Sequence, residues 1–399
     1  MHRSTTTRKL IIIRPLIIPR LLNFIMFFLC SCLSGVQHAT RGLRWALIPL
    51  LLLPGIICAN VEQSTAKIYH FRLLAFGTYI ELMVTAVSKN KANQFKKLVH
   101  TQFSTMHRQW HSTDNSLLST LNQGLSKRHW VPLPQSIRTL LIRSKQLSML
   151  SHHRFNPAIG RLVNLWGFNN SLKLRSMPPT KNDINKLIQL KPQMDDLEFK
   201  KNLIRSRNAA VQLDFGAIAK GYAIDRVTVM LKQQGFKNFI INAGGDLKAI
   251  GRHPSRAWRI AIRNPANKSQ VIAGIVINNE EAVFTSGDYE RYFIHQGIRF
   301  HHILNPLDGQ PVHHTRSVTV IHTDATLADA AATALFIAGP KHWPSVAKKM
   351  GLKYVMLIDR NEVIHLSQAM KQRIQLFNHK FRIRLVHLKQ IRLKLPPLK

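Results

Sequence analysis

The sequence predicts an α+β fold, a single large domain in which mixed or antiparallel sheets pack against helices. Short β-type runs bounded by Gly, Pro, Asn or Asp recur at 239–241, 258–262, 272–277, 282–285 and 317–322. Apolar residues at helical spacing fill 91–107 and 136–151, and a short amphipathic stretch follows at 181–190. Apolar residues make up 45% of the 399 positions, which is enough for a sizeable core.

Three further segments complete the predicted elements. Residues 71–87 alternate well enough to form a strand, with Gly77-Thr78 marking a turn or bulge within it. Residues 210–213 predict a strand that runs into a glycine-containing turn and then a helix carrying Lys220. The Ala-rich run 324–338 predicts a helix that Gly339-Pro340 closes.

The net charge of +38 comes from a shortage of acids, 19 against 57 Lys and Arg. No acid precedes Glu62 and none follows Glu362, so a basic region 1–60 and a basic tail 371–399 flank a more balanced domain at 61–370. Such a charge suits nucleic acid, anionic lipid or a phosphorylated ligand. The sequence contains no recognisable nucleic-acid-binding module, so we expect no nucleic-acid partner. The tail is interpreted as a solvated or loosely packed extension, with an amphipathic membrane-surface segment as the alternative.

The amino-terminal region 1–60 is interpreted as a targeting region. Its second apolar stretch, 45–59, has the layout of a signal peptide that ends at Ala59. Its first, 10–33, contains Leu29-Cys30-Ser31-Cys32, which is similar to a lipoprotein cleavage box. We expect export across a bacterial inner membrane to a periplasmic or membrane-anchored state, with signal peptide, lipoprotein and anchor all left open. All three cysteines lie before residue 59, which argues against disulfides or a Cys nucleophile in the folded part.

Two glycine-containing clusters are candidates for binding an anion. In the segment 214–225, free N–H groups at a helix start and the Lys220 ammonium would suit a phosphate; the alternative is an ordinary turn capped by Asp214. In the segment 240–246, Gly244-Gly245 allows close approach of backbone or ligand; a plain hairpin turn is the alternative.

Two further clusters carry polar and titratable side chains. The segments 285–292 and 300–309 include His302, which could act as a general base or contact phosphate, or could be an ordinary surface histidine. Asp329 and Thr333 are spaced i, i+4, so on a helix their oxygens would project together, as Mg²⁺ prefers. The alternative is a helix with one buried Thr and one Asp near its start.

Taken in order, these segments resemble the ApbE family of FAD:protein FMN transferases. The resemblance runs from about Phe71 to Ile358, and it includes Phe76-Gly-Thr78 near its start and the segments 112–122 and 155–168. It implies a T-fold-related domain that binds FAD as substrate and Mg²⁺ as cofactor. It also implies transfer of FMN to a Thr or Ser hydroxyl of a target flavoprotein, a subunit of a membrane redox complex, with release of AMP.

The resemblance assigns roles residue by residue. It implies catalytic roles for His302 and Asp288, and Mg²⁺ binding by Ala217 through its carbonyl and by Asp329 and Thr333 through their side chains. The residues implied to contact FAD are Phe76, Arg154, Phe155, Asn156, Asp214, Lys220, Gly244, Gly245, Thr285, Ser286, Gly287 and Ile303.

Three positions depart from the family pattern. Phe76 replaces the usual Met, Asn156 replaces an Asp, and Asn305 replaces the common Asp before Pro306. An aromatic ring can also pack on a flavin, whereas the Asn156 contact keeps an acceptor but loses a charge. Two other functions remain open: hydrolysis of FAD to FMN and AMP at the same site, and non-catalytic FAD carriage.

Overall fold

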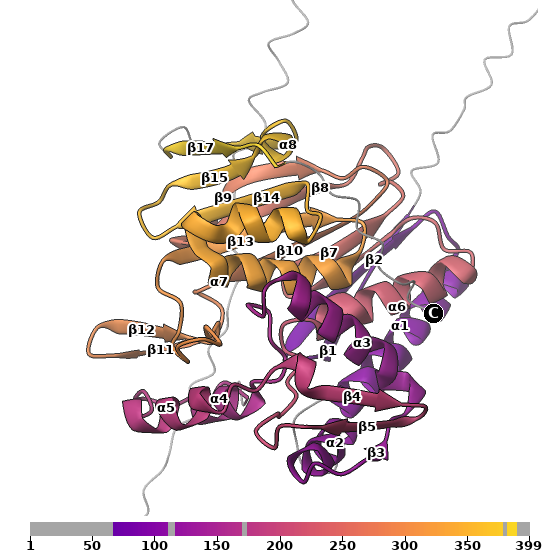
Figure 1. Ribbon diagram of the computed structural model, residues 1–399. Helices are drawn as coiled ribbons and strands as arrows, with labels where there is room; N and C mark the ends of the chain where they lie inside the picture. Colours follow the sequence, from indigo (N-terminus) through magenta and orange to yellow (C-terminus); the bar gives the residue numbers. More distant parts are fainter. Residues whose placement is uncertain (1–66, 111–115, 170–173, 378–380, 389–399) are drawn as a thin grey trace, which may run out of the picture. The chain divides into compact units, whose positions relative to one another are not determined.

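The computed structural model describes residues 67–110, 116–169, 174–377 and 381–388 (Figure 1). They lie in one compact unit that spans Gln63–Lys399. The predicted targeting region 1–60, with all three cysteines, lies outside the described residues. Within the described residues, no helix combines the length and apolar character needed to cross a membrane.

A nine-stranded sheet forms the centre of this unit. Its strand order is β1-β2-β6-β7-β10-β13-β14-β15-β17, and neighbours are antiparallel except β15 and β17, which are parallel. The prediction of a mixed sheet within an α+β domain is therefore confirmed. The strands are β1 (Ile68–Ala75), β2 (Thr78–Thr85), β6 (Phe239–Ala243), β7 (Asp246–Ile250), β10 (Glu280–Gly287), β13 (Thr315–His322), β14 (Tyr354–Asp359), β15 (Ile364–Ser367) and β17 (Ile383–Val386).

Two cores cover the two faces of this sheet. Successive strand residues point to opposite faces, so Ile241 joins the core beneath the helices while Ile240 joins the other. The helices on the first face are α1 (Lys89–Trp110), α6 (Ala219–Gln233) and α7 (Ala325–Lys349). A small sheet of β8 (Arg259–Asn264), β9 (Asn267–Val276) and β16 (Ile374–Leu376) packs on the second.

The remaining elements extend the domain around these layers. Helices α2 (Leu117–Ser126) and α3 (Gln135–Leu150) join α1 in the first core, beside the short strands β3 (Val131–Pro132), β4 (Leu197–Lys200) and β5 (Leu203–Ser206). A satellite core around Trp166 unites α4 (Gly160–Leu165), α5 (Lys181–Gln189), β11 (Tyr292–His295) and β12 (Ile298–His301). A 3-10 turn, η1 (Met194–Asp196), precedes β4, and α8 (Gln368–Lys371) follows β15.

Three predicted elements need correction. Residues 71–87 form the hairpin β1–β2 rather than one strand, because Phe76-Gly77 makes a tight reversal. Residues 210–213 form no strand; Gln212 makes only an isolated bridge to Ile159. The predicted end of the Ala-rich helix is confirmed: α7 consists of two helices joined at a kink, where Gly339 takes a non-helical conformation with φ of 67° and Pro340, which needs no N–H partner, opens the next turn.

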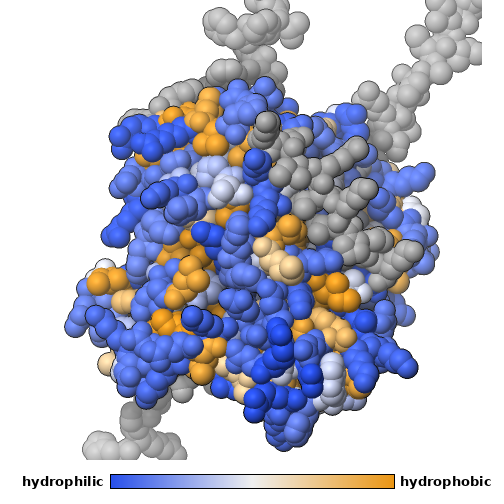
Figure 2. Space-filling view, viewed as in Figure 1, coloured by the Kyte–Doolittle hydropathy of each residue, from blue (hydrophilic) through white to orange (hydrophobic). Residues whose placement is uncertain are grey.

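The tail is the third correction. It is not a loosely packed extension throughout, because β16 pairs with β9 and β17 pairs with β15. Two apolar side chains in these strands, Ile374 and Leu376, pack against the second core. On the face drawn in Figure 2, hydrophilic residues predominate and apolar ones lie in several separate groups.

Candidate functional site

A cavity of about 1330 Å³ gathers the predicted site residues. It lies where the turns of two hairpins, the start of α6, the end of β10, the segment after β12 and the middle of α7 meet. The predicted residues that line it are Phe76, Arg154, Phe155, Asn156, Asp214, Ala217, Lys220, Gly244, Gly245, Thr285, Ser286, Gly287, His302, Ile303, Asp329 and Thr333. Asp288 is absent from this lining.

Two adjacent hairpin turns form one end of the cavity. Phe76 and Gly77 link β1 to β2 with φ of 53° and 70°, and Gly244 and Gly245 link β6 to β7 with φ of 69° and 109°. The second turn packs on the first, since a Cβ on Gly244 would lie 2.4 Å from Oγ1 of Thr78. The hairpin reading of 244–245 is therefore correct, and the same turn lines the cavity.

Phe76 is a non-glycine residue in the left-handed region, where side chains are strained. Its ring stacks on Trp110 at 6.0 Å between centroids and meets Phe103 edge-on at 5.9 Å. Its N–H donates to Nδ1 of His107. These contacts hold an aromatic surface at the cavity wall, in a conformation that the surrounding packing must stabilise.

A charged pair joins α6 to β7 inside the cavity. Nζ of Lys220 donates to Oδ2 of Asp246, whose other oxygen accepts the N–H of Thr285 at 2.9 Å. Burial would lower the pKa of Lys220, but Asp246 and Asp329 together raise it. Asp214 accepts the N–H of Gly216 at 2.9 Å and so closes a local turn, but it does not cap α6, whose N-cap is Ile218. The ammonium therefore stays charged at the cavity wall.

Asp329 and Thr333 project from the same face of α7, as their spacing predicts. Asp329 is buried, with 5% of its surface exposed, and its Oδ2 accepts the N–H of Gly221 at 2.8 Å. Oγ1 of Thr333 lies 3.2 Å from Oγ of Ser286. Burial raises the pKa of Asp329 to about 7; Lys220 opposes this rise and Asp246 adds to it.

This donor set fits Mg²⁺. A buried carboxylate with a raised pKa gains from a divalent cation that stabilises its ionised form. The hydroxyls of Thr333 and Ser286 add hard oxygens, and Ala217 lines the same cavity. The described residues hold no group of three His, Cys, Asp or Glu arranged as a metal cage. A site of few protein oxygens matches Mg²⁺, which keeps waters and phosphate oxygens as ligands.

His302 lines the cavity as a neutral imidazole. Burial lowers its pKa well below the usual value, and the nearby cation of Arg291 lowers it further. Its Nδ1 lies 3.3 Å from the carbonyl oxygen of Arg291. Because a carbonyl can only accept, Nδ1 carries the proton and Nε2 keeps its lone pair. The ring can therefore accept a proton through Nε2.

Asp288 does not share this position. Its Oδ1 lies 3.6 Å from Nη1 of Arg299, and its N–H donates to the carbonyl of Arg316. Burial raises the pKa of Asp288, while the Arg299 and Arg316 guanidinium groups lower it. The structure thus draws the carboxylate toward cations outside the cavity lining, and gives it no contact with the predicted reaction centre.

The side chain of Asn156 ties its own loop to the segment before η1. Its Oδ1 accepts the N–H of Ala158 at 3.1 Å and its Nδ2 donates to the carbonyl of Pro192 at 2.9 Å. A carboxylate could not make the second bond, since it has no proton to donate. The Asn at this position therefore fixes the loop that presents Arg154 and Phe155 to the cavity.

Two lining residues escaped prediction. Asp246 anchors Lys220, and Arg291 places a guanidinium beside His302, with Nη1 donating to the carbonyl of Phe168 at 3.2 Å. Asp246 lies in the candidate segment 240–246 and Arg291 in the candidate segment 285–292, but nothing in the local sequence indicates that these side chains face the cavity. Eight Lys and Arg side chains line the cavity against five Asp and Glu, so its wall carries a positive charge suited to phosphates.

Comparison with known proteins identifies the class to which this fold and cavity belong. The sequence matches the model of the ApbE family over residues 76–356. The chain belongs to this family.

Named relatives and solved structures agree. An FAD:protein FMN transferase of Rhodobacter capsulatus is 36% identical over 87% of this chain and 67% of its own length. One from Klebsiella pneumoniae is 30% identical over 78% of this chain and 95% of its own. The ApbE protein of Thermotoga maritima superposes with a TM-score of 0.70 at 30% identity, covering 77% of this chain and 99% of its own. The Pseudomonas stutzeri flavinyl transferase ApbE gives 0.66 at 28%, over 77% and 96%.

Proposed function

We propose that this chain is a Mg²⁺-dependent FAD:protein FMN transferase that moves FMN from FAD to a Thr or Ser hydroxyl of an acceptor flavoprotein. AMP is the second product. The observation that carries the proposal is the meeting, in one basic cavity, of the Lys220 cation, the buried Asp329 carboxylate and a neutral His302. The names of the relatives support the flavin transferase activity.

The residues divide the work by chemical type. Lys220 and Arg291 supply positive charge to the diphosphate, and the aromatic surface of Phe76 offers a stacking wall for a planar ring. Asp329, Thr333 and the Ala217 carbonyl would hold Mg²⁺, which when bound neutralises charge on the phosphates.

The transfer is a substitution at phosphorus. The acceptor hydroxyl oxygen forms a bond to the phosphorus of the FMN half, and the bond from that phosphorus to the AMP oxygen breaks. Nε2 of His302 accepts the hydroxyl proton as the new bond forms, since Nδ1 already carries a proton. Lys220, held by Asp246, stabilises the negative charge that develops on the departing AMP.

We also propose that the enzyme works outside the cytoplasm, periplasmic or anchored to the inner membrane, on a subunit of a membrane redox complex. The signal-peptide layout of 45–59 and the basic residues before it support this location. An acceptor held in the same membrane would meet the enzyme at high local concentration.

One assay tests the reaction. The full-length chain is mixed with FAD, Mg²⁺ and a candidate redox subunit with a Thr acceptor, and in-gel flavin fluorescence is read beside AMP release. We expect covalent fluorescence and AMP in equal amounts, and a loss of about 1,000-fold in Asp329→Ala, because a metal ion contributes several kcal/mol to such transition states.

Other outcomes overturn the proposal in different ways. AMP without labelled protein, repeated with several acceptors, would indicate an FAD pyrophosphatase. Tight FAD binding with neither product would indicate a carrier. A variant as active as the wild type would remove Asp329 from the site.

A further inference from the structure

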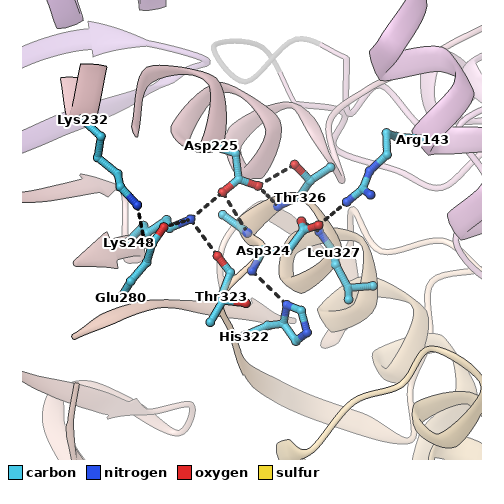
Figure 3. A network of polar contacts seen from close by, with 11 residues as sticks. Arg143, Asp225, Lys232, Lys248, Glu280, His322, Thr323, Asp324, Thr326 and Leu327 are labelled. Atoms are coloured by element: carbon cyan, nitrogen blue, oxygen red, sulfur yellow. Dashed lines mark hydrogen bonds and ion pairs between the residues drawn. The ribbon is translucent and has the colours of Figure 1, made fainter. Parts of the chain in front are cut away.

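Asp225 lies at the centre of a buried polar network beneath the start of α7 (Figure 3). Asp225 lies on α6, and its carboxylate accepts four hydrogen bonds. Oδ1 accepts from Nζ of Lys248 at 2.9 Å and from the N–H of Ala325 at 3.1 Å. Oδ2 accepts from the N–H of Thr326 at 2.8 Å and from its hydroxyl at 2.7 Å. One residue of α6 therefore caps the first turn of α7, where free N–H groups favour an anion.

A second carboxylate links the same two helices, but it belongs to α7 and accepts its hydrogen bond from α6. Asp329 of α7 accepts the N–H of Gly221 in α6 at 2.8 Å. Gly221 and Asp225 are one turn apart on α6, and Ala325 and Asp329 are one turn apart on α7. The helices touch between the two bonds, since a Cβ on Gly221 would lie 2.3 Å from the Ala325 carbonyl oxygen. The Asp225 carboxylate of α6 therefore caps the start of α7, and the Asp329 carboxylate of α7 binds a backbone N–H group of α6.

Strand β7 fixes where α6 lies along this contact. Asp246 and Lys248 point to the same face of the strand, and they pair with Lys220 and Asp225 of α6. In the first pair the strand supplies the acid and the helix supplies the cation. In the second pair the helix supplies the acid and the strand supplies the cation. A slide of α6 by about 7 Å would place like charges opposite each other, so the two pairs select one position.

We propose that Asp225 is a positioning residue for the transfer reaction, because it fixes the start of α7 so that Asp329 and Thr333 project into the cavity. Asp329 and Thr333 follow Ala325 by one and two helical turns. A displacement of the first turn of α7 therefore displaces both side chains. The proposal rests on the proposed function and assigns Asp225 no contact with substrate.

The free-energy cost of burying the Asp225–Lys248 ion pair supports a role beyond stability. Asp225 and Lys248 are 3% and 6% exposed in their side chains. Buried ion pairs add little stability relative to apolar residues of the same size, and their best attested use is to specify one arrangement. The neighbouring pair of Lys232 and Glu280 belongs to the same network, but Lys232 is half exposed and contacts neither helix start.

The experiment compares three full-length test variants and one control variant with the wild type. Thr326→Val removes the hydroxyl donor to Asp225 and keeps the shape of the Thr326 side chain. Thr326→Ser keeps the hydroxyl, and Asp225→Asn removes the carboxylate charge. Lys232→Met is the matched control in the same network. The readouts are kcat and KM for FAD, and the rise in melting temperature when Mg²⁺ alone is added.

For Asp225→Asn we expect kcat to fall about tenfold or more, as for residues that orient a metal ligand, with KM for FAD within threefold. The rise in melting temperature on adding Mg²⁺ should shrink in Asp225→Asn and Thr326→Val, return in Thr326→Ser and persist in Lys232→Met. If Asp225→Asn does not fold, the Thr326 pair carries the test.

Variants that melt earlier but keep wild-type kcat and an unchanged Mg²⁺ response would overturn the inference and leave the proposed function standing. A wild type that transfers no FMN but shows a Mg²⁺ response that these variants lose would overturn the proposed function, and would still support Asp225 as the residue that positions Asp329 and Thr333.

Discussion

The two ends of the cavity are built by different means. At the α6–α7 end, buried charges meet backbone N–H groups: Asp225 with Thr326 across 101 residues, and Asp329 with Gly221 across 108. At the hairpin end, Phe76 and Gly77 make a local turn, and ring stacking holds Phe76 in place. The first end depends on tertiary structure, the second mostly on neighbouring residues.

Exposure separates the two ends further. Asp246 and Asp329 are each 5% exposed, whereas Leu74 and Tyr79, beside the hairpin turn, are 68% and 58% exposed. Electrostatic interactions are stronger in the buried end because water is excluded there. The comparison suggests that chemistry is concentrated at the α6–α7 end and next to it, and that the hairpin end mainly sets affinity for the flavin.

After the loss expected for Asp329→Ala, the largest effect should come from His302, which adjoins the charged end. We expect His302→Asn to reduce kcat about 100-fold with little change in FAD affinity, since a positioned base contributes that much. Because its pKa is lowered, the acid limb of kcat/KM for FAD in the wild type should lie below pH 6.5 at saturating Mg²⁺, which would keep Asp329 ionised. An acid limb at or above pH 6.5, or a fully active variant, would contradict the assignment.

Gly221→Ala tests how tightly the α6–α7 end is fitted. The added Cβ would overlap the Ala325 carbonyl oxygen, so the helices must separate, and overpacking of this kind costs about 1–3 kcal/mol. We expect a lower melting temperature and a roughly tenfold loss of kcat, as for other residues that orient a metal ligand. Gly235→Ala is the matched control, because its Cβ would meet nothing within 4 Å, although its φ of 80° adds strain. Equal effects from both would show that the helix contact is not special.

Phe76→Leu probes the hairpin end. It removes the stacked ring but keeps an apolar side chain, so we expect FAD affinity to fall about 2–10-fold, the value of an aromatic pair, while kcat changes less. Equilibrium titration of flavin fluorescence measures the affinity. A fall in kcat larger than the fall in affinity would break the division between the two ends.

Asp359 lies outside the cavity lining and should affect stability alone. Burial acts to raise its pKa, but hydrogen bonds from His365, Val363 and Asn361 lower it overall. A lowered folded-state pKa contributes stability that is present above the unfolded value of about 3.9 and lost as pH falls through the folded value. Asp359→Asn should therefore melt earlier at pH 7, the difference shrinking below about pH 4, with transfer activity unchanged. A constant difference across that range would exclude the carboxylate as its source.

The sequence predicted the parts whose signal is local. The i, i+4 spacing of Asp329 and Thr333, the glycine pair 244–245 and the helices near 91–107 and 136–151 all depend on residues close in the chain. The placement of Asp288 could not be predicted, because Arg299, eleven residues later, draws its carboxylate away. Asp225 stood in a segment noted for its glycines, but its partners lie on α7 and β7, and only packing brings them together.

The strands of the tail have a consequence for solubility. Without β16 and β17, the backbone groups of β9 and β15 that they bond would be free, and free strand edges recruit other chains. In the intact protein β17 is the outermost strand at this edge of the large sheet, and it carries the exposed Arg384, with the exposed Arg382 just before the strand. Cations on such an edge repel a second copy approaching in register. The basic residues of the tail would in this way reduce aggregation through the sheet edge. A chain cut at residue 370 would lose both the strands that pair with β9 and β15 and the cations that repel a second copy.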